Sequence, residues 1–378
     1  MSRGHGWARG AFVAAALLAL AVPALPACGP AYGPDFLLAF RAGERAYEAG
    51  RWDEAGGEFE RAARLATRVK DRDEARFMQA RSALKLGRHE QARAAYVALA
   101  NATPTGPRAA RARFDIAELD IDHGDATLGW RELEEALVAH PSHGSARVAL
   151  TRICDHLAET EGEVAVRAWL EARLPGFAGS EAEEQAKYGL ARSFERGGSL
   201  EEAHAAYLRV AREHPYPHGS LHDDALYRAS ELAERMGRYE LAVADLRALL
   251  AVREVALGGQ SYERPRMPMA QLRIAELHRD RLNDPEGARR EYRRMYETHP
   301  SSLLADDAIW QEALLARAAG DGARACEIAA TIQKDFARSR YARCVAVVCP
   351  SAVPPEGERP CPRYIAAPGE PADGAADE

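Results

Sequence analysis

Beyond Gly33, apolar residues recur every three or four positions, which is the spacing of amphipathic helices. Stretches in which apolar and polar residues alternate, as in a half-buried strand, are almost absent. Short turns with a glycine or an aspartate separate the helical stretches. The pattern predicts an all-α protein made of successive helices joined by short connections.

One kind of turn recurs along the chain, with a glycine or an aspartate followed by polar residues and then by a small residue. Gly50, Gly87 and Gly124 begin the first three turns, so the first two steps are 37 residues each. The small residues are Ala55, Ala92, Gly129, Ala203, Ala242, Ala288 and Ala325. A period of this size, with two helices in each unit, is typical of a solenoid.

Two further positions keep a constant distance from the small residue. A proline follows it by twelve residues at Pro104, Pro141, Pro215 and Pro300. A larger apolar residue follows it by four residues at Phe59, Tyr96, Leu133, Tyr207, Leu246 and Tyr292. Glycine ends the first helix of a pair and proline ends the second. This arrangement resembles the tetratricopeptide repeat (TPR).

The resemblance covers roughly residues 35–337 and implies an all-α, TPR-type α-solenoid, a right-handed superhelix of about eight helix pairs. The fourth pair, between about 144 and 178, is degenerate because it lacks a good small and large pair. An insertion loop is expected at 257–268, where glycines and prolines gather. Residues 338–349 are a possible capping helix, and 350–378 are expected to be a disordered tail rich in proline, glycine and acidic residues.

The N-terminal segment is typical of a secretory signal. Arg3 and Arg9 precede an apolar run of 12 residues from Ala11 to Val22. The run is shorter than the roughly 20 residues that cross a bilayer, and its length suits a signal peptide. The sequence therefore predicts a signal peptide over residues 1–27.

The residues that end this segment, Leu25-Pro26-Ala27-Cys28, resemble the lipobox of bacterial lipoproteins. The resemblance implies that Cys28 carries a lipid anchor, with 28–34 as a short tether. Gly29 follows the cysteine, with no aspartate there to indicate retention in the inner membrane. The implied location is the periplasmic face of the outer membrane. Simple cleavage, which would release a soluble periplasmic protein, is the alternative.

Charge and motifs exclude several classes of function. The chain has 57 acidic and 50 basic residues with both signs mixed along it, so no nucleic-acid partner is expected. It lacks CxxC, HExxH, GxSxG and P-loop motifs, so we expect no enzyme, no metal site and no cofactor. His140, His214 and His299 precede helix-ending prolines, where a histidine suits the helix dipole.

The cysteines gather near the C-terminal end of the chain. In an oxidising periplasm, Cys326, Cys344, Cys349 and Cys361 are candidates for one or two disulfides. We prefer pairings such as Cys326 with Cys344 and Cys349 with Cys361, because a spacing of five residues does not favour a bond between Cys344 and Cys349. Cys154 is expected to be a buried helix residue.

An aromatic residue precedes the small residue by fifteen positions in six units. These residues are Phe40, Phe77, Phe114, Tyr188, Tyr227 and Trp310. In TPR solenoids this position lies on the first helix of each pair, whose face lines the concave groove. The row is therefore a candidate for binding a partner's peptide segment. The alternative is that the rings pack between neighbouring first helices.

The lipobox, the period and the connection His299-Pro300-Ser301-Ser302 resemble the TPR lipoprotein of the β-barrel outer-membrane assembly machinery. The stretch from Asp335 to Ala342 also resembles linkers in that family and in the TPR partner of the Tol–Pal envelope system. The resemblance implies a scaffold that binds other envelope proteins. The alternative is a periplasmic coordinator of peptidoglycan or division machinery. A murein hydrolase would need a separate catalytic fold, which the sequence does not contain.

Overall fold

The computed structural model describes residues 33–252, 264, 266–354 and 360–366. Within these residues the regular elements are all helical, with no strand. The chain forms two compact units, with the division after Ala112. The predicted signal peptide, Cys28 and most of the predicted tether lie outside the described residues.

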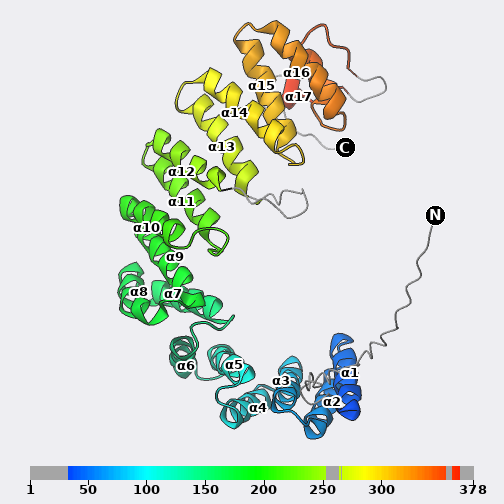
Figure 1. Cartoon of the computed structure of the whole chain (residues 1–378), viewed down its shortest axis with the longest axis vertical. Coiled ribbons are helices and arrows are strands. Elements are labelled where there is room, and N and C mark those ends of the chain that lie inside the picture. Colours follow the sequence, from blue (N-terminus) through cyan, green and yellow to red (C-terminus); the bar gives the residue numbers. More distant parts are fainter. Residues whose placement is uncertain (1–32, 253–263, 265, 355–359, 367–378) are drawn as a thin grey trace, which may run out of the picture. The chain divides into compact units, whose positions relative to one another are not determined.

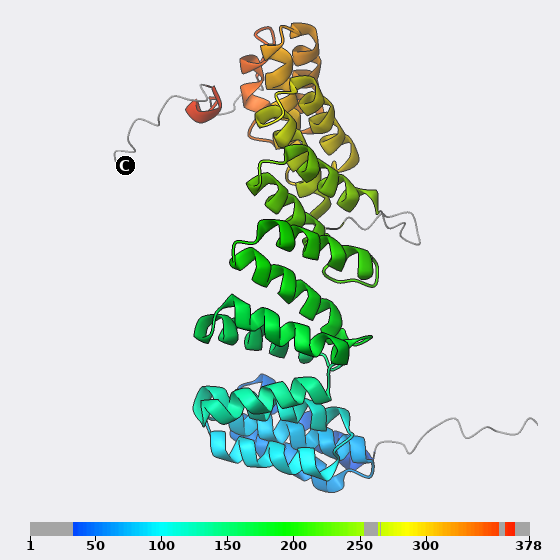
Figure 2. The same ribbon diagram turned by 90° about the vertical axis from the view of Figure 1, so that its left-hand side faces the viewer.

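Each unit is a succession of antiparallel helix pairs (Figures 1 and 2). The first unit contains α1 (Pro34–Glu48), α2 (Trp52–Leu65), α3 (Val69–Lys85) and α4 (His89–Ala102), and α5 (Pro107–His123) runs from it into the second unit. The second unit continues with α6 (Ala126–Ala139), α7 (Ala146–Thr160), α8 (Glu163–Phe177), α9 (Glu181–Arg196), α10 (Leu200–Glu213), α11 (His222–Arg235) and α12 (Tyr239–Ala251). After the insertion come α13 (Arg266–Asp280), α14 (Pro285–Thr298), α15 (Ala305–Ala318) and α16 (Gly322–Asp335). The described helices form eight pairs, and the predicted TPR-type α-solenoid fold is confirmed.

The turns inside the pairs explain why glycine recurs. Gly87 and Gly237 adopt φ values of 70° and 72°, in the left-handed region that a residue without Cβ enters without strain. The amide of the following residue then donates to a carbonyl five residues back, as Arg88 does to Ala83. This bond ends the first helix and sets where the second begins.

The small residue brings the two helices of a pair together. Gly129 on α6 lies against the backbone of α5. A Cβ at this position would lie 2.5 Å from the amide nitrogen of Ile121 and 2.8 Å from the carbonyl oxygen of Ala117. Alanine fills the same position in the other units that fit the pattern, where it is fully buried.

Replacement of Gly129 by alanine is expected to destabilise the protein by about 2 kcal/mol, because the added methyl group overlaps a backbone that cannot move without separating the pair. Gly57 on α2 is a matched control, since a Cβ there meets no atom within 4 Å. The same substitution at Gly57 is expected to stabilise by roughly 0.5–1 kcal/mol through helix propensity. Urea unfolding followed by circular dichroism measures both. Equal stability of the two variants would contradict this account of the pair.

The fourth pair is more regular than the sequence pattern indicated. In its turn Gly162 itself donates to Leu157, five residues back, whereas in five of the other turns the residue after the glycine makes this bond. The glycine therefore lies one position later in the turn, while the spacing from the accepting carbonyl to the small position is unchanged. Val166 takes the small position and Leu170 the large position, and both are buried. The degeneracy lies in the place of the glycine and in a valine where other units have alanine or glycine.

The insertion before the seventh pair lies mostly outside the described residues. Helix α13 begins at Arg266, so Met267 and Pro268, expected in the loop, lie in its first turn. Arg264 is buried and donates to the carbonyls of Leu249 and Val252 and to a carboxylate oxygen of Asp223, at 2.6 Å for the carboxylate. Its guanidinium thereby satisfies carbonyls at the C-terminal end of α12.

The C-terminal segment folds back on the last helix pair. A 3₁₀ helix, η1 (Ala342–Val347), packs on α16 in one hydrophobic cluster with α15, and a short helix α17 (Arg363–Ala366) follows. Tyr341 stacks on Trp310, with ring centroids 4.9 Å apart. We call residues 337–354 and 360–366 the C-terminal cap. Ile365 is buried, so the prediction of a disordered tail from residue 350 is wrong for 360–366.

Two disulfides hold the C-terminal cap. The four cysteines predicted to form bridges do so, but the preferred pairing of Cys326 with Cys344 and Cys349 with Cys361 is wrong. The bridges join Cys326 to Cys349 and Cys344 to Cys361. Their Cα–Cα distances are 4.8 and 4.9 Å, within the range that a disulfide requires. Sequence spacing could not show that Cys349 lies beside α16 while Cys344 lies beside the segment that precedes α17.

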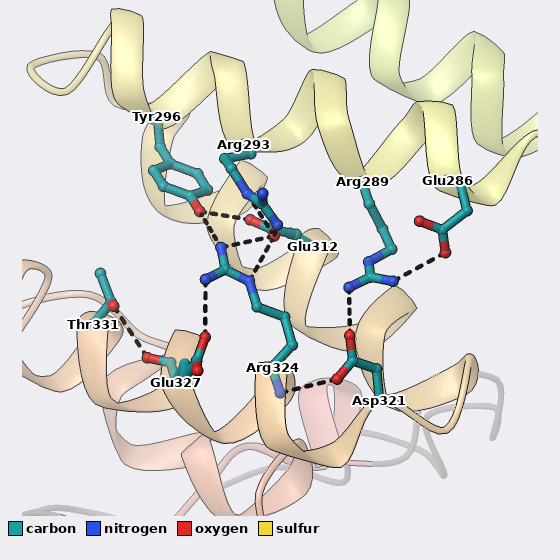
Figure 3. A network of polar contacts seen from close by, with 9 residues as sticks. All are labelled: Glu286, Arg289, Arg293, Tyr296, Glu312, Asp321, Arg324, Glu327 and Thr331. Atoms are coloured by element: carbon teal, nitrogen blue, oxygen red, sulfur yellow. Dashed lines mark hydrogen bonds and ion pairs between the residues drawn. The ribbon is translucent and has the colours of Figure 1, made fainter.

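A buried carboxylate joins the last three solenoid helices (Figure 3). Glu312 on α15 has no exposed surface. Its carboxylate accepts from Arg293 of α14 at 2.6 Å, from Arg324 of α16 at 3.0 Å and from the hydroxyl of Tyr296 at 2.5 Å. The hydrogen bond to Glu312 raises the pKa of the Arg293 guanidinium. The three groups that contact the Glu312 carboxylate are thus all hydrogen-bond donors. A buried charge requires partners of this kind.

Candidate functional site

The aromatic row lies on the odd-numbered helices, at one repeated place in each pair. In the turn of each pair, one backbone carbonyl near the end of the first helix accepts a hydrogen bond, as that of Ala83 does. In the units that fit the pattern, the row residue lies six positions before this carbonyl, as Phe77 does before Ala83. We call this place the row position. Phe77, Phe114 and Trp310 are buried there, and Phe40, Tyr188 and Tyr227 are half-buried.

Three of these rings pack on the large residue of the second helix in the same pair. Phe40 meets Phe59 edge to face, with ring centroids 5.3 Å apart. The corresponding distances are 5.6 Å from Phe77 to Tyr96 and 5.1 Å from Tyr188 to Tyr207. Edge-to-face and tilted contacts of this kind stabilise by roughly 0.5–1.5 kcal/mol beyond area burial. The row thus contributes to the core of each pair.

Several rings are also covered by a residue that begins the next pair. The Arg108 guanidinium lies over Phe77 at 4.6 Å, and His143 stacks on Phe114 at 5.4 Å. The Arg266 guanidinium lies over Tyr227 at 4.8 Å. This coverage favours the packing interpretation. A direct contact between a partner and the half-buried rings of Phe40, Tyr188 and Tyr227 stays a prediction.

Both tyrosines of the row have a raised pKa, and Tyr188 is a hydrogen-bond donor. Burial, together with the acceptor Asp224, raises the pKa of Tyr188, whose hydroxyl donates to that carboxylate. Burial also raises the pKa of Tyr227. Asp224 accepts from Arg266 as well, so this one carboxylate links helix α11 to both α9 and α13.

Sequence reasoning missed two members of the row, one because its residue is not aromatic and one because its turn is longer. In the fourth pair the accepting carbonyl is that of Leu157, which places Thr151 at the row position. In the seventh pair Asp284 donates to His278, six residues back, so the turn is one residue longer and Leu272 takes the position instead of Arg273. Leu272 packs on the cluster that contains Tyr292. Counting back from the accepting carbonyl locates both.

A hollow of about 590 Å³ opens at Thr151, where the row lacks a large side chain. It is lined by Gly144, Arg147, Val148, Thr151, Arg152, Asp155 and Gln185. The Gln185 amide of α9 donates to the Thr151 hydroxyl at 3.1 Å, which closes one side. We call this feature the α7–α9 hollow.

A second hollow of about 570 Å³ lies over α11 and α13, and its walls are charged. Its arginines already have carboxylate partners: Arg235 pairs with Glu195 at 3.0 Å, and Arg228 pairs with Glu231 at 2.9 Å. Arg273 bridges Glu234 and Glu276. Each arginine that lines this hollow is paired with a carboxylate, and the four carboxylates outnumber the three guanidinium groups, so the hollow is a poor site for an anionic ligand.

The residues capable of catalysis or metal binding are dispersed. Cys154 is a buried free thiol, as expected, and burial raises its pKa to about 12, so it stays protonated near neutral pH and is a poor nucleophile. In the described part of the chain no three His, Cys, Asp or Glu side chains gather as metal ligands would. No described helix combines the length and the hydropathy needed to span a bilayer.

The tetratricopeptide repeat family model matches residues 40–107, 77–128 and 224–302. Solved structures resembling the chain include a tetratricopeptide repeat protein from Parabacteroides merdae, with 12% identity, a TM-score of 0.35, and coverage of 74% of this chain and 99% of the other. The C-terminal part of a TPR repeat-containing protein from Cytophaga hutchinsonii shows 13% identity, a TM-score of 0.43, and coverage of 71% and 98%. The TPR domain of P58(IPK) shows 15% identity, a TM-score of 0.27, and coverage of 83% and 87%. No curated protein matches the chain significantly in sequence.

Proposed function

We propose that this chain of tetratricopeptide-type repeats is a non-enzymatic scaffold of the bacterial cell envelope, anchored by a lipid on Cys28 at the periplasmic face of the outer membrane. It holds partner proteins on the face of its odd-numbered helices and takes part in outer-membrane protein assembly. The observation that carries the scaffold role is that eight helix pairs and a C-terminal cap make up the described chain. The two surface hollows lie on the odd-numbered helices.

Two features support the envelope location. The segment before Cys28 has the composition of a lipoprotein signal, with a basic start and an apolar run. The two disulfides of the C-terminal cap fit an oxidising compartment, since the bacterial cytosol keeps thiols reduced. Both features agree with a chain that is exported before it completes its fold.

The test is affinity purification of the tagged protein from detergent-solubilised outer membranes, with a Cys28→Ala variant alongside. Recovery of β-barrel assembly subunits with the anchored form alone is the expected result. Recovery of Tol–Pal or peptidoglycan proteins equally with both forms would replace this proposal by the periplasmic-coordinator alternative. A wild-type protein that recovers no envelope partner would contradict both.

A further inference from the structure

The α7–α9 hollow is a gap in an otherwise filled row. Elsewhere the row position holds a ring or, in the seventh pair, a leucine that packs on a cluster. Thr151 is much smaller than any of these residues, and the hollow opens beside it. Its volume is within the range of small-molecule pockets in proteins and leaves room for a large side chain together with neighbouring groups of a peptide.

The charged groups around the hollow leave one cation without a partner. Asp155 accepts from Arg192 at 2.8 Å and from Arg196 at 3.0 Å, and Arg152 pairs with Asp122 at 2.5 Å. Arg147 also lines the hollow, and in the described residues no carboxylate lies within ion-pair distance of it. An anionic group that enters would therefore meet an unneutralised guanidinium.

The rim of the hollow also carries an exposed apolar side chain. Val148 lies next to Arg147 on α7 and is 61% exposed. A cation and an apolar surface side by side suit a segment that has a carboxylate near a large apolar residue. The second hollow, in which each arginine is paired with a carboxylate, lacks this combination.

We propose that the α7–α9 hollow binds an acidic peptide segment of a partner protein. A large apolar side chain of the segment takes the place of the missing row residue, and a neighbouring carboxylate pairs with Arg147. This inference rests on the proposed function, since it names the partner chemistry that one part of the scaffold face recognises. The recognition combines burial of an apolar anchor with an ion pair at its edge.

The test begins with selection of random peptides of about 12 residues, displayed on phage, against the immobilised Cys28→Ala form of the full chain. We expect the enriched sequences to place Asp or Glu within a few residues of a large apolar residue. Fluorescence anisotropy then measures the affinity of a labelled enriched peptide. Enrichment without an acidic residue, or no enrichment, would overturn the proposal.

Two variants locate the binding. Thr151→Phe supplies the missing ring and occupies the part of the hollow beside α7, and Arg147→Glu reverses the free charge. Each is expected to weaken binding by at least about tenfold, while Arg147→Lys keeps most of it. Leu272→Phe, which enlarges the other non-aromatic row position, and Arg131→Glu, which reverses an exposed charge on α6, are the controls and should bind within about twofold of wild type.

Binding by Thr151→Phe at wild-type strength, with its melting temperature unchanged, would overturn the inference. If Thr151→Phe fails to fold, Arg147→Glu decides, because it changes a half-exposed side chain. The affinity purification of envelope partners distinguishes failure of this inference from failure of the proposed scaffold function. If those partners are recovered with Thr151→Phe as with wild type, the scaffold role stands and the role of the hollow falls.

Discussion

Removing the disulfide between Cys326 and Cys349, by replacing both with alanine, is expected to free most of the C-terminal cap. The bridge closes a loop with a sequence separation of 23 residues, and loop-closure entropy for a bridge of this length corresponds to about 3 kcal/mol. In a repeat stack this loss is local, because each part contacts only its neighbours. We therefore expect residues 342–347 and the end of α16 to open while α7–α12 stay unchanged.

Hydrogen exchange followed by mass spectrometry measures this opening segment by segment. The Cys344→Ala, Cys361→Ala double variant is the matched comparison, since its bridge has a sequence separation of 17. It should release residues 360–366 and leave η1 protected, because η1 is still tied to α16. Addition of a reductant to wild type should reproduce both effects. Unchanged exchange of residues 342–347 in the reduced protein would show that packing alone holds the cap.

Replacing Glu312 by alanine is expected to cost about 3 kcal/mol, the lower end of the range for breaking a buried ion pair. Arg293 of α14 and Arg324 of α16 converge on this carboxylate, and its removal leaves two guanidinium groups close together without the charge that they share. Both arginines are partly exposed and can turn toward water, which keeps the cost at that lower end.

Glu327 offers a matched control. It pairs with the same Arg324, at 3.2 Å, but its side chain is 68% exposed. Replacing it by alanine should cost less than about 1 kcal/mol, as for other surface ion pairs. Urea unfolding, combined with hydrogen exchange of α14–α16, measures both variants. Equal destabilisation by the two substitutions would mean that burial of Glu312 adds nothing to its role.

Much of the fold could be predicted because its determinants are local. A glycine that must adopt positive φ, a small residue where two helices touch and a proline where a helix ends each leave a mark at a fixed sequence offset. Gly87 and Gly129 are examples, and both lie where the pattern expected them.

The parts that failed depend on turn length or on contacts between distant residues. In the fourth pair the fifteen-residue offset from Thr151 to Val166 is kept, but neither residue is of the type that the pattern expects. One more residue before Ala288 shifts the offset in the seventh pair, so Leu272 could not be recognised as a row member. The disulfide partners of Cys344 and Cys349 depend on how η1 packs, because Cys349 lies beside α16 and Cys344 beside the segment before α17. Sequence spacing does not contain that information. The α7–α9 hollow was missed for the same reason, since a gap has no residue of its own to mark it.

The stacking of Tyr341 on Trp310 has a consequence for self-assembly. In a stack of similar units, the last unit exposes a surface on which the first helix of another unit could pack. Head-to-tail contacts of this kind extend into filaments unless their rotation closes a ring. Here Arg340 and Tyr341 engage Asp307 of α15, and the ring of Tyr341 covers the last row residue. The chain thereby occupies its own terminal docking surface, so that a second molecule cannot add to this end as a ninth repeat.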